Sequence, residues 1–247
     1  MTQTGVAMNM EIPLEFERKR SKDGSLHVTD EFYNTLISGF GALLSFFGII
    51  LLTYDAQVSH KPVHFFSFLV YGFGLLNVFI ASALHHGVNG SQRTNYLLRQ
   101  WDYFAISLMI AGSFTPFCLI LLRNSLGWTV LSLAWILAIA GIALKALYPE
   151  APKWITTSLF LGMGWLGVVI AKPIYLLLSW QAVLVLVIGG LIYTVGAVIY
   201  FFERPNPVPG RFGFHEIWHL FVLGGAATHY FLMFFFVLPF SGTTGLH

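Results

Sequence analysis

Two histidines four residues apart stand out near the C-terminal end of the chain, in the segment GFHEIWHLF. In a helix this spacing puts His215 and His219 on one face about 6 Å apart, so both imidazoles can bind one metal ion. A third ligand then has to come from another segment. His86 is well placed for this role at the end of another apolar segment, with Ser82 one helical turn earlier on the same face. We therefore interpret His86, His215 and His219 as metal ligands.

The chemistry that such a site favours is hydrolysis. Three imidazoles and one open position are typical of catalytic zinc, which polarises a carbonyl group and lowers the pKa of a bound water to about 7. Asp102 opens another apolar segment and can orient that water, deprotonate it or carry its proton away. We expect zinc as the cofactor and Asp102 as a catalytic candidate.

Each of these residues also has a simpler explanation. A pair of histidines at a helix end can be two polar residues at a membrane interface. His85 and His86 are adjacent and point about 100° apart, so at most one of them serves the same ion. The segment HEIWH matches the HExxH pattern of zinc peptidases, with Glu216 as the base, but the pattern is short and falls at a predicted membrane interface.

His229 follows on the same predicted helix, about 15 Å deeper than His219 and within about 40° of the direction of His215. We expect it to face the bundle interior without reaching the ion, and to hydrogen-bond a serine or threonine. The remaining histidines fall in tails or at loop edges and are predicted to be surface residues; they are His27, His60, His64 and His247.

The composition defines the environment of these groups. Hydrophobic residues make up 56% of the 247 positions and charged residues 10%, with a mean hydropathy of +0.73. These values lie far outside the range of soluble domains and predict an integral membrane protein. The net charge of +2 is small and scattered, which argues against nucleic acid as a partner. The single cysteine, Cys118, has no partner for a disulfide within the chain.

Seven apolar segments are long enough to cross a bilayer as helices. They cover residues 34–54, 64–86, 102–122, 128–147, 154–172, 180–202 and 215–238. The fifth break between segments, around AKPIYLLLSW, has the weakest turn and charge signals. Six spans, one of them a long kinked helix, are therefore the alternative. We predict an all-α bundle of seven transmembrane helices at 28–240, a polar tail at 1–27 and a short tail at 241–247.

The basic residues give this bundle a direction. Ten Lys and Arg residues fall on the side of the N-terminal tail and three on the other side. The positive-inside rule then predicts a cytoplasmic N-terminus and a C-terminus outside. With this topology the polar residues of four spans share the cytoplasmic end; they are Glu31, Asn34, Ser38, Ser82, His85, His86, Asp102, His215, Glu216 and His219. Ionisable groups in a membrane are costly and usually mark function.

These segments resemble the hemolysin III family, within the progestin and adipoQ receptor (adiponectin receptor-like) group. The similarity covers nearly all of residues 28–238 and depends on five motifs in order: DEFYN, IASALHH, WDYFAISLMIAGSFTPF, LGMGWLG and FHEIWHLFVLGGAATHY. The resemblance implies seven spans, a cytoplasmic N-terminus and a zinc ion near the inner face. It assigns the ligands to His86, His215 and His219, and it places Ser82 and Asp102 around the zinc-bound water.

One position departs from the family. Many bacterial members carry a histidine four residues after the asparagine of the first span, where this chain has Ser38. That histidine is not among the implied ligands, so the predicted zinc site is unaffected, while a role of this position in proton transfer or gating is in doubt.

Three functions fit these observations. The first is a zinc-dependent hydrolase of a ceramide-like amide or related acyl bond, with membrane lipids as partners. The second is a pore-forming or cytolytic protein, and the third is a lipid sensor or homeostasis factor with structural zinc. A haem protein using two histidines is a weaker fourth option. We expect a multi-pass protein of a bacterial inner membrane.

Overall fold

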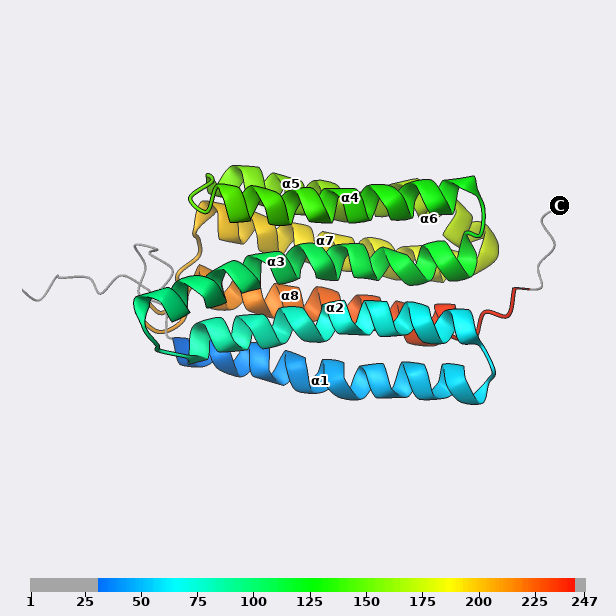
Figure 1. Cartoon of the computed structure of the whole chain (residues 1–247), viewed down its shortest axis with the longest axis horizontal. Helices are drawn as coiled ribbons and strands as arrows, with labels where there is room; N and C mark the ends of the chain where they lie inside the picture. Colours follow the sequence, from blue (N-terminus) through cyan, green and yellow to red (C-terminus); the bar gives the residue numbers. More distant parts are fainter. Residues whose placement is uncertain (1–30, 243–247) are drawn as a thin grey trace, which may run out of the picture.

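The computed structural model describes residues 31–242, so the predicted tail at 1–27 and residues 243–247 lie outside the described part of the chain. Seven long apolar helices run side by side in it (Figure 1). The elements are α1 (Glu31–Val58), α2 (Pro62–Gly87), α3 (Gln92–Pro116), α4 (Ser125–Leu147), α5 (Lys153–Trp165), α6 (Gly167–Leu177), α7 (Trp180–Phe202) and α8 (Phe214–Leu232). The all-α fold and the seven spans are confirmed.

Two spans continue as short π-helical segments, Phe117–Leu121 after α3 and Met233–Val237 after α8. The first of them follows Pro116, which has no backbone N–H to donate to the preceding turn. With these extensions the third span covers Gln92–Leu121 and the seventh Phe214–Val237.

The third span begins earlier than the hydropathy predicted, at Gln92 rather than at 102, because its first turns are polar and are capped by Ser91. The Ser91 Oγ atom accepts a hydrogen bond from the backbone N–H of Thr94. The fifth span consists of α5 and α6, joined at Leu166, and it ends before Ser179, whose hydroxyl accepts from the N–H of Ala182 and starts α7. This break excludes the alternative of six spans.

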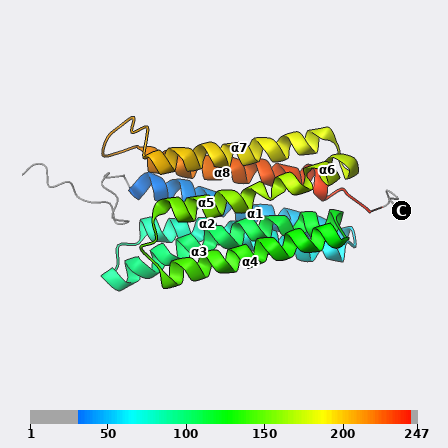
Figure 2. The same ribbon diagram turned by 90° about the horizontal axis from the view of Figure 1, so that it is seen from above.

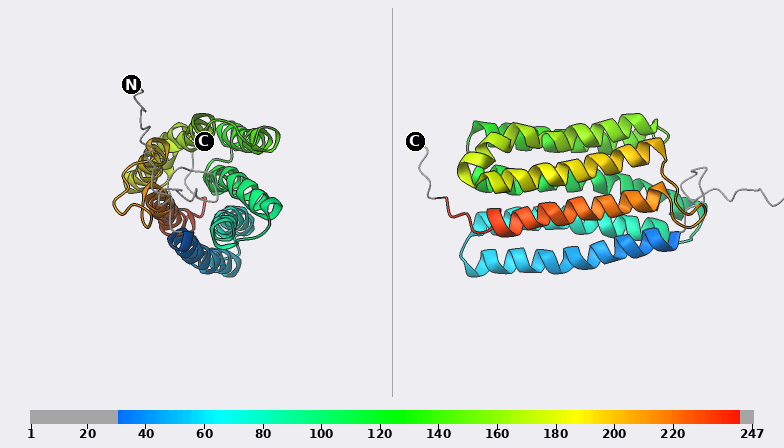
Figure 3. Two further views of the ribbon diagram at one scale, coloured as in Figure 1. Left: turned by 90° about the vertical axis from the view of Figure 1, so that its left-hand side faces the viewer. Right: turned by 180° about the vertical axis from the view of Figure 1, so that it is seen from behind.

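The helices form a closed bundle. Neighbours in the chain pack together from α1 to α4, α8 lies between α1 and α7, and α5 contacts α3, α4 and α7 (Figures 2 and 3). The third span is the most enclosed, with 72% of its apolar window buried against 22% for the fifth and sixth spans. The residues of α3 therefore face the interior, and those of α5 to α7 mostly face outwards.

Small residues allow these helices to approach closely, as is usual in membranes. A Cβ atom at Gly41 of α1 would lie 2.5 Å from the ring of Phe79, and one at Gly74 of α2 would lie 3.1 Å from the carbonyl oxygen of Leu108. The buried face of α1 repeats such residues every three or four positions: Asn34, Ser38, Gly41, Ser45 and Gly48.

All elements that carry the predicted site meet at one end of the bundle, which we call the α1 end. There α1, α3 and α8 begin and α2 ends (Figure 1). The cytoplasmic location of this end remains a prediction from the charge distribution.

Candidate metal centre

Three histidines from two helices converge at the α1 end. One ring nitrogen from each of His86 on α2 and His215 and His219 on α8 lies within 4.8 Å of the others. The Nε2 atoms of His86 and His219 are 3.1 Å apart, and the three ring centroids are separated by 4.9 to 5.1 Å. Each of the three residues is at most 8% exposed. The structure thus brings together the three residues that the sequence predicted to be ligands.

The chemistry of this cluster fits a metal ion. Zinc is bound by imidazole nitrogens, and three of them facing one buried point are the donor set of a catalytic zinc site. The short distance between the Nε2 atoms of His86 and His219 requires that one of them donates or that both coordinate a shared ion. No acidic residue is needed to complete this donor set.

Glu31, at the start of α1, holds one of these rings in place. Its Oε2 atom lies 2.5 Å from Nδ1 of His86, so the opposite nitrogen of that ring faces the cluster. A carboxylate behind a ligating histidine fixes its tautomer and raises its basicity. The sequence placed Glu31 at this end of the bundle but did not assign it this contact.

Glu216 has a structural role in this geometry. It is fully buried, and its Oε1 atom accepts a hydrogen bond of 3.0 Å from Asn34 on α1. Its Oε2 atom accepts one of 2.7 Å from the backbone N–H of Gly213. Both carboxylate oxygens are therefore engaged: Oε1 joins the start of α8 to α1, and Oε2 caps the first turn of α8 itself. This arrangement does not favour Glu216 as the base of a zinc peptidase.

Ser38 and Ser82 form a buried pair beside the histidines, with their Oγ atoms 2.9 Å apart. Ser38 thus contacts the serine that precedes His86 by one turn. Only Ser82 of this pair lines the cavity described below. The pair connects α1 to α2 at the depth of the cluster.

His85 lies closer to the site than the sequence suggested. One nitrogen each of His85 and His86 and one carboxylate oxygen of Asp102 lie within 4.8 Å of one another, which makes a second possible metal-binding group. The rings of His85 and His86 have centroids 4.7 Å apart, and His85 is 5% exposed. Adjacent residues can both be buried here because α2 packs against α1 on one side and α3 on the other.

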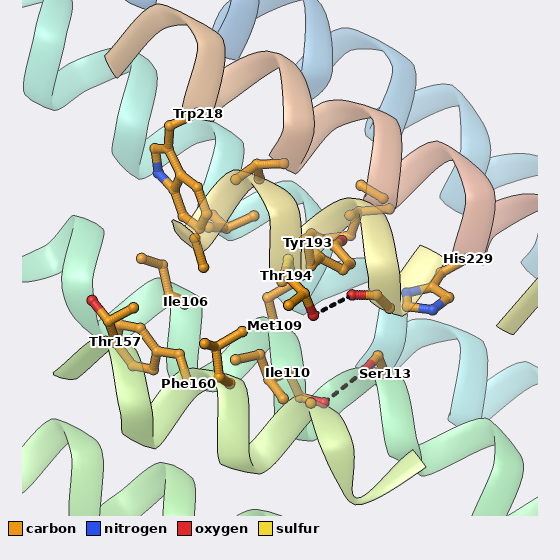
Figure 4. A pocket seen from close by; sticks show the side chains of 18 of the residues that line it. Ile106, Met109, Ile110, Ser113, Thr157, Phe160, Tyr193, Thr194, Trp218 and His229 are labelled. Atoms are coloured by element: carbon orange, nitrogen blue, oxygen red, sulfur yellow. Dashed lines mark hydrogen bonds between the residues drawn. The ribbon is translucent and has the colours of Figure 1, made fainter. Parts of the chain in front are cut away.

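A cavity of about 240 Å³ extends from the cluster into the bundle. The polar residues that line its α1 end include Ser82, His85, Arg99, Asp102, His215 and His219. Most of the remaining wall is apolar and comes from α2, α3, α5, α6, α7 and α8; Figure 4 shows part of it. The cavity is thus polar at the histidine end and mainly apolar over the rest of its wall.

The fold and site define a class: seven-helix integral membrane proteins with a buried histidine cluster at one end. The family model "Haemolysin-III related" matches residues 26–230, and the chain belongs to this family.

Similar proteins come from bacteria and from animals. The chain is 38% identical to Hemolysin-3 of Bacillus cereus over 212 residues, covering 86% of this chain and 94% of that protein. It is 34% identical to the Hemolysin-3 homolog of Bacillus subtilis over 209 residues, covering 85% and 95%. The Monocyte to macrophage differentiation factor of Homo sapiens is 30% identical over 166 residues, which is 66% of each chain.

Proposed function

We propose that this protein hydrolyses a ceramide-like amide or related acyl bond of a membrane lipid, with zinc held by His86, His215 and His219. The observation that carries the proposal is that the buried histidine cluster lies at one end of a long, mainly apolar cavity. A hydrolytic centre for lipids needs this combination, because the acyl chain has to lie in an apolar space while the bond to be cleaved meets polar groups.

Zinc in this position would supply a Lewis acid for the carbonyl group and would make water nucleophilic at neutral pH. The side chains around it have separate tasks. Glu31 orients His86 through the contact at Nδ1. Asp102 lies in the cavity wall, where its carboxylate accepts a proton from water and returns it to the leaving group. Ser82, held by Ser38, presents a hydroxyl to the same space.

The apolar wall is the binding site for the acyl chain in this proposal. Its aliphatic and aromatic residues exclude water from the chain and position the carbonyl at the histidines. We place the reaction at the cytoplasmic face of a bacterial inner membrane. Most basic residues fall on the side of the α1 end, and the positive-inside rule predicts that this side is cytoplasmic.

The test is fatty-acid release from a panel of ceramides and phospholipids by purified, zinc-loaded protein. We expect release from at least one lipid class and none from the His86→Ala variant. Zinc-loaded protein that releases no fatty acid from any of them would refute the hydrolase. If deletion then altered membrane lipid composition, a sensor with structural zinc would be the better account.

The name of the relative from Bacillus cereus, Hemolysin-3, supports membrane lysis as a second candidate function. A water-filled pore needs a hydrophilic path through the whole membrane, whereas most of the residues that line the cavity are apolar. Leakage of dye from liposomes separates the two candidates. Leakage that persists in the His86→Ala variant would favour lysis over hydrolysis.

A further inference from the structure

The cavity has a second set of polar side chains, far from the histidine cluster. Ser113 of α3, Tyr193 and Thr194 of α7 and His229 of α8 line its deep part, and we call them the deep polar group (Figure 4). His229 follows His219 by ten residues of helix, about 15 Å. This is about half of the roughly 30 Å thickness of a bilayer's hydrocarbon core. The deep polar group therefore lies far inside the membrane.

The position of His229 is fixed by α7. Its ring packs against the ring of Tyr193 with the centroids 5.5 Å apart. Gly189, one turn earlier on α7, leaves the space for the imidazole, since a Cβ atom there would lie 2.7 Å from Nε2 of His229. The imidazole is thus built into the contact between α7 and α8.

The hydrogen-bonding capacity of this region is only partly used. Ser113 and Thr194 each donate to a carbonyl oxygen of their own helix at 2.7 Å, and both oxygens can still accept. The Nε2 atom of His229 is buried and makes no hydrogen bond of regular geometry within residues 31–242, although the backbone of Leu186 lies near the ring. The hydroxyl of Tyr71, which also lines the cavity, likewise has no hydrogen-bond partner within these residues. Unpaired polar groups are costly in hydrocarbon, so a ligand that pairs with them is favoured.

The charged residues around the cavity indicate whether a ligand of the deep polar group is neutral or charged. The charged residues among those that line the cavity are Arg99 and Asp102, and both belong to the part of α3 nearest the α1 end. No lysine or arginine of the described chain lines the deep part, so a carboxylate or phosphate would have no counter-ion there. Phenol, hydroxyl and imidazole groups suit a neutral oxygen that both donates and accepts.

From this placement we infer that the deep polar group binds a neutral hydroxyl group carried on the distal part of a lipid acyl chain. The protein then selects lipids with oxygenated chains over lipids with plain hydrocarbon chains. This inference rests on the proposed function in one respect, that the occupant of the cavity is a lipid chain with its head at the histidines. It does not depend on turnover or on bound zinc.

The test compares two free fatty acids of equal length, one with a hydroxyl group near its methyl end and one unsubstituted. Their binding to the purified full-length protein is measured by displacement of a fluorescent fatty acid. We expect the hydroxylated acid to bind about tenfold more tightly, which corresponds to about 1.4 kcal/mol. The preference should fall at least threefold in Tyr193→Phe, which removes only the hydroxyl, and in His229→Leu.

The control is Tyr54→Phe, the same chemical change at a tyrosine of α1 that is 69% exposed on the outer surface of the bundle. It should keep the full preference. Measurements in the His86→Ala background separate this inference from the hydrolase, because neither acid is a substrate and no zinc is required.

Equal binding of the two acids, or a preference unchanged in both variants, would overturn the inference and leave the hydrolase untouched. A clear preference for the hydroxylated acid in a protein that hydrolyses no lipid would support the inference and refute the hydrolase alone. Failure of both acids to bind would refute the lipid-chain occupant and with it this inference.

Discussion

The Nδ1 atom of His86 lies 2.5 Å from the Oε2 atom of Glu31, which joins the first turn of α1 to the last turn of α2 at the histidine cluster. This contact leaves the Nε2 atom of His86 facing His219. Glu31 thereby determines which nitrogen of His86 is available to a metal ion, although Glu31 itself belongs to neither of the two groups that could bind one. The first helix is in this way a functional part of the site.

Replacing Glu31 should weaken zinc binding without abolishing it. Loss of a carboxylate behind a ligating histidine typically lowers metal affinity 10- to 100-fold, and we expect about this effect for Glu31→Ala. Competition of purified protein with a chromogenic chelator measures the affinity.

The matched control is Glu150→Ala, which removes a carboxylate that is 85% exposed and pairs with Arg99. Its zinc affinity should equal that of the parent. If Glu31→Ala and Glu150→Ala bound zinc equally well, the orienting role of Glu31 would be wrong.

The ligands themselves are tested by metal content. His86→Ala and His215→Ala should each lose stoichiometric zinc, measured by mass spectrometry of the purified protein, because two remaining imidazoles hold the ion too weakly to survive purification. His60→Asn, a change at an exposed loop histidine, is the control and should retain zinc. Zinc retained in His215→Ala but lost in His85→Ala would instead place the ion in the group of His85, His86 and Asp102.

Asp102 should matter for turnover rather than for zinc binding. A positioned general acid or base contributes about 100- to 10,000-fold to a rate, so Asp102→Asn should lower fatty-acid release by at least about 100-fold. Its zinc content should stay at the level of the parent protein. Unchanged turnover, measured on the best lipid of the panel, would remove Asp102 from the proposed mechanism.

The seven spans could be predicted because each is an apolar run of membrane-spanning length. The grouping of the candidate site residues could be predicted because chain direction brings the ends of four spans together. The rotation of each helix about its own axis could not be predicted. Hydropathy indicates which face of a helix points inwards only when one face is polar, and these helices are apolar on most faces. The contact of Glu31 with His86, the pairing of Ser38 with Ser82 and the place of His85 therefore emerged only from the structure.

The hydrogen bonds of Glu216 predict a stability effect. Glu216→Ala would leave the side-chain amide of Asn34 and the backbone N–H of Gly213 without their acceptor. A buried donor left unsatisfied costs about 1 to 3 kcal/mol, so the thermal unfolding temperature in detergent should fall clearly. Zinc content should persist in the folded protein. A variant with normal stability and no turnover would instead restore Glu216 as a catalytic base.

Substitutions at two glycines of α1 distinguish the effect of close helix packing from the effect of helix propensity. A Cβ atom at Gly41 would lie 2.5 Å from the ring of Phe79, whereas one at Gly39 would have no atom within 4 Å. Gly41→Ala should therefore destabilise the bundle by about 1 to 3 kcal/mol through overpacking against α2. Gly39→Ala should be neutral or stabilising by up to about 1 kcal/mol, because alanine favours helix more than glycine does. Thermal unfolding of the two variants in the same detergent compares their stabilities directly. Equal stabilities would show that the contact between Gly41 and Phe79 does not limit the approach of α1 to α2.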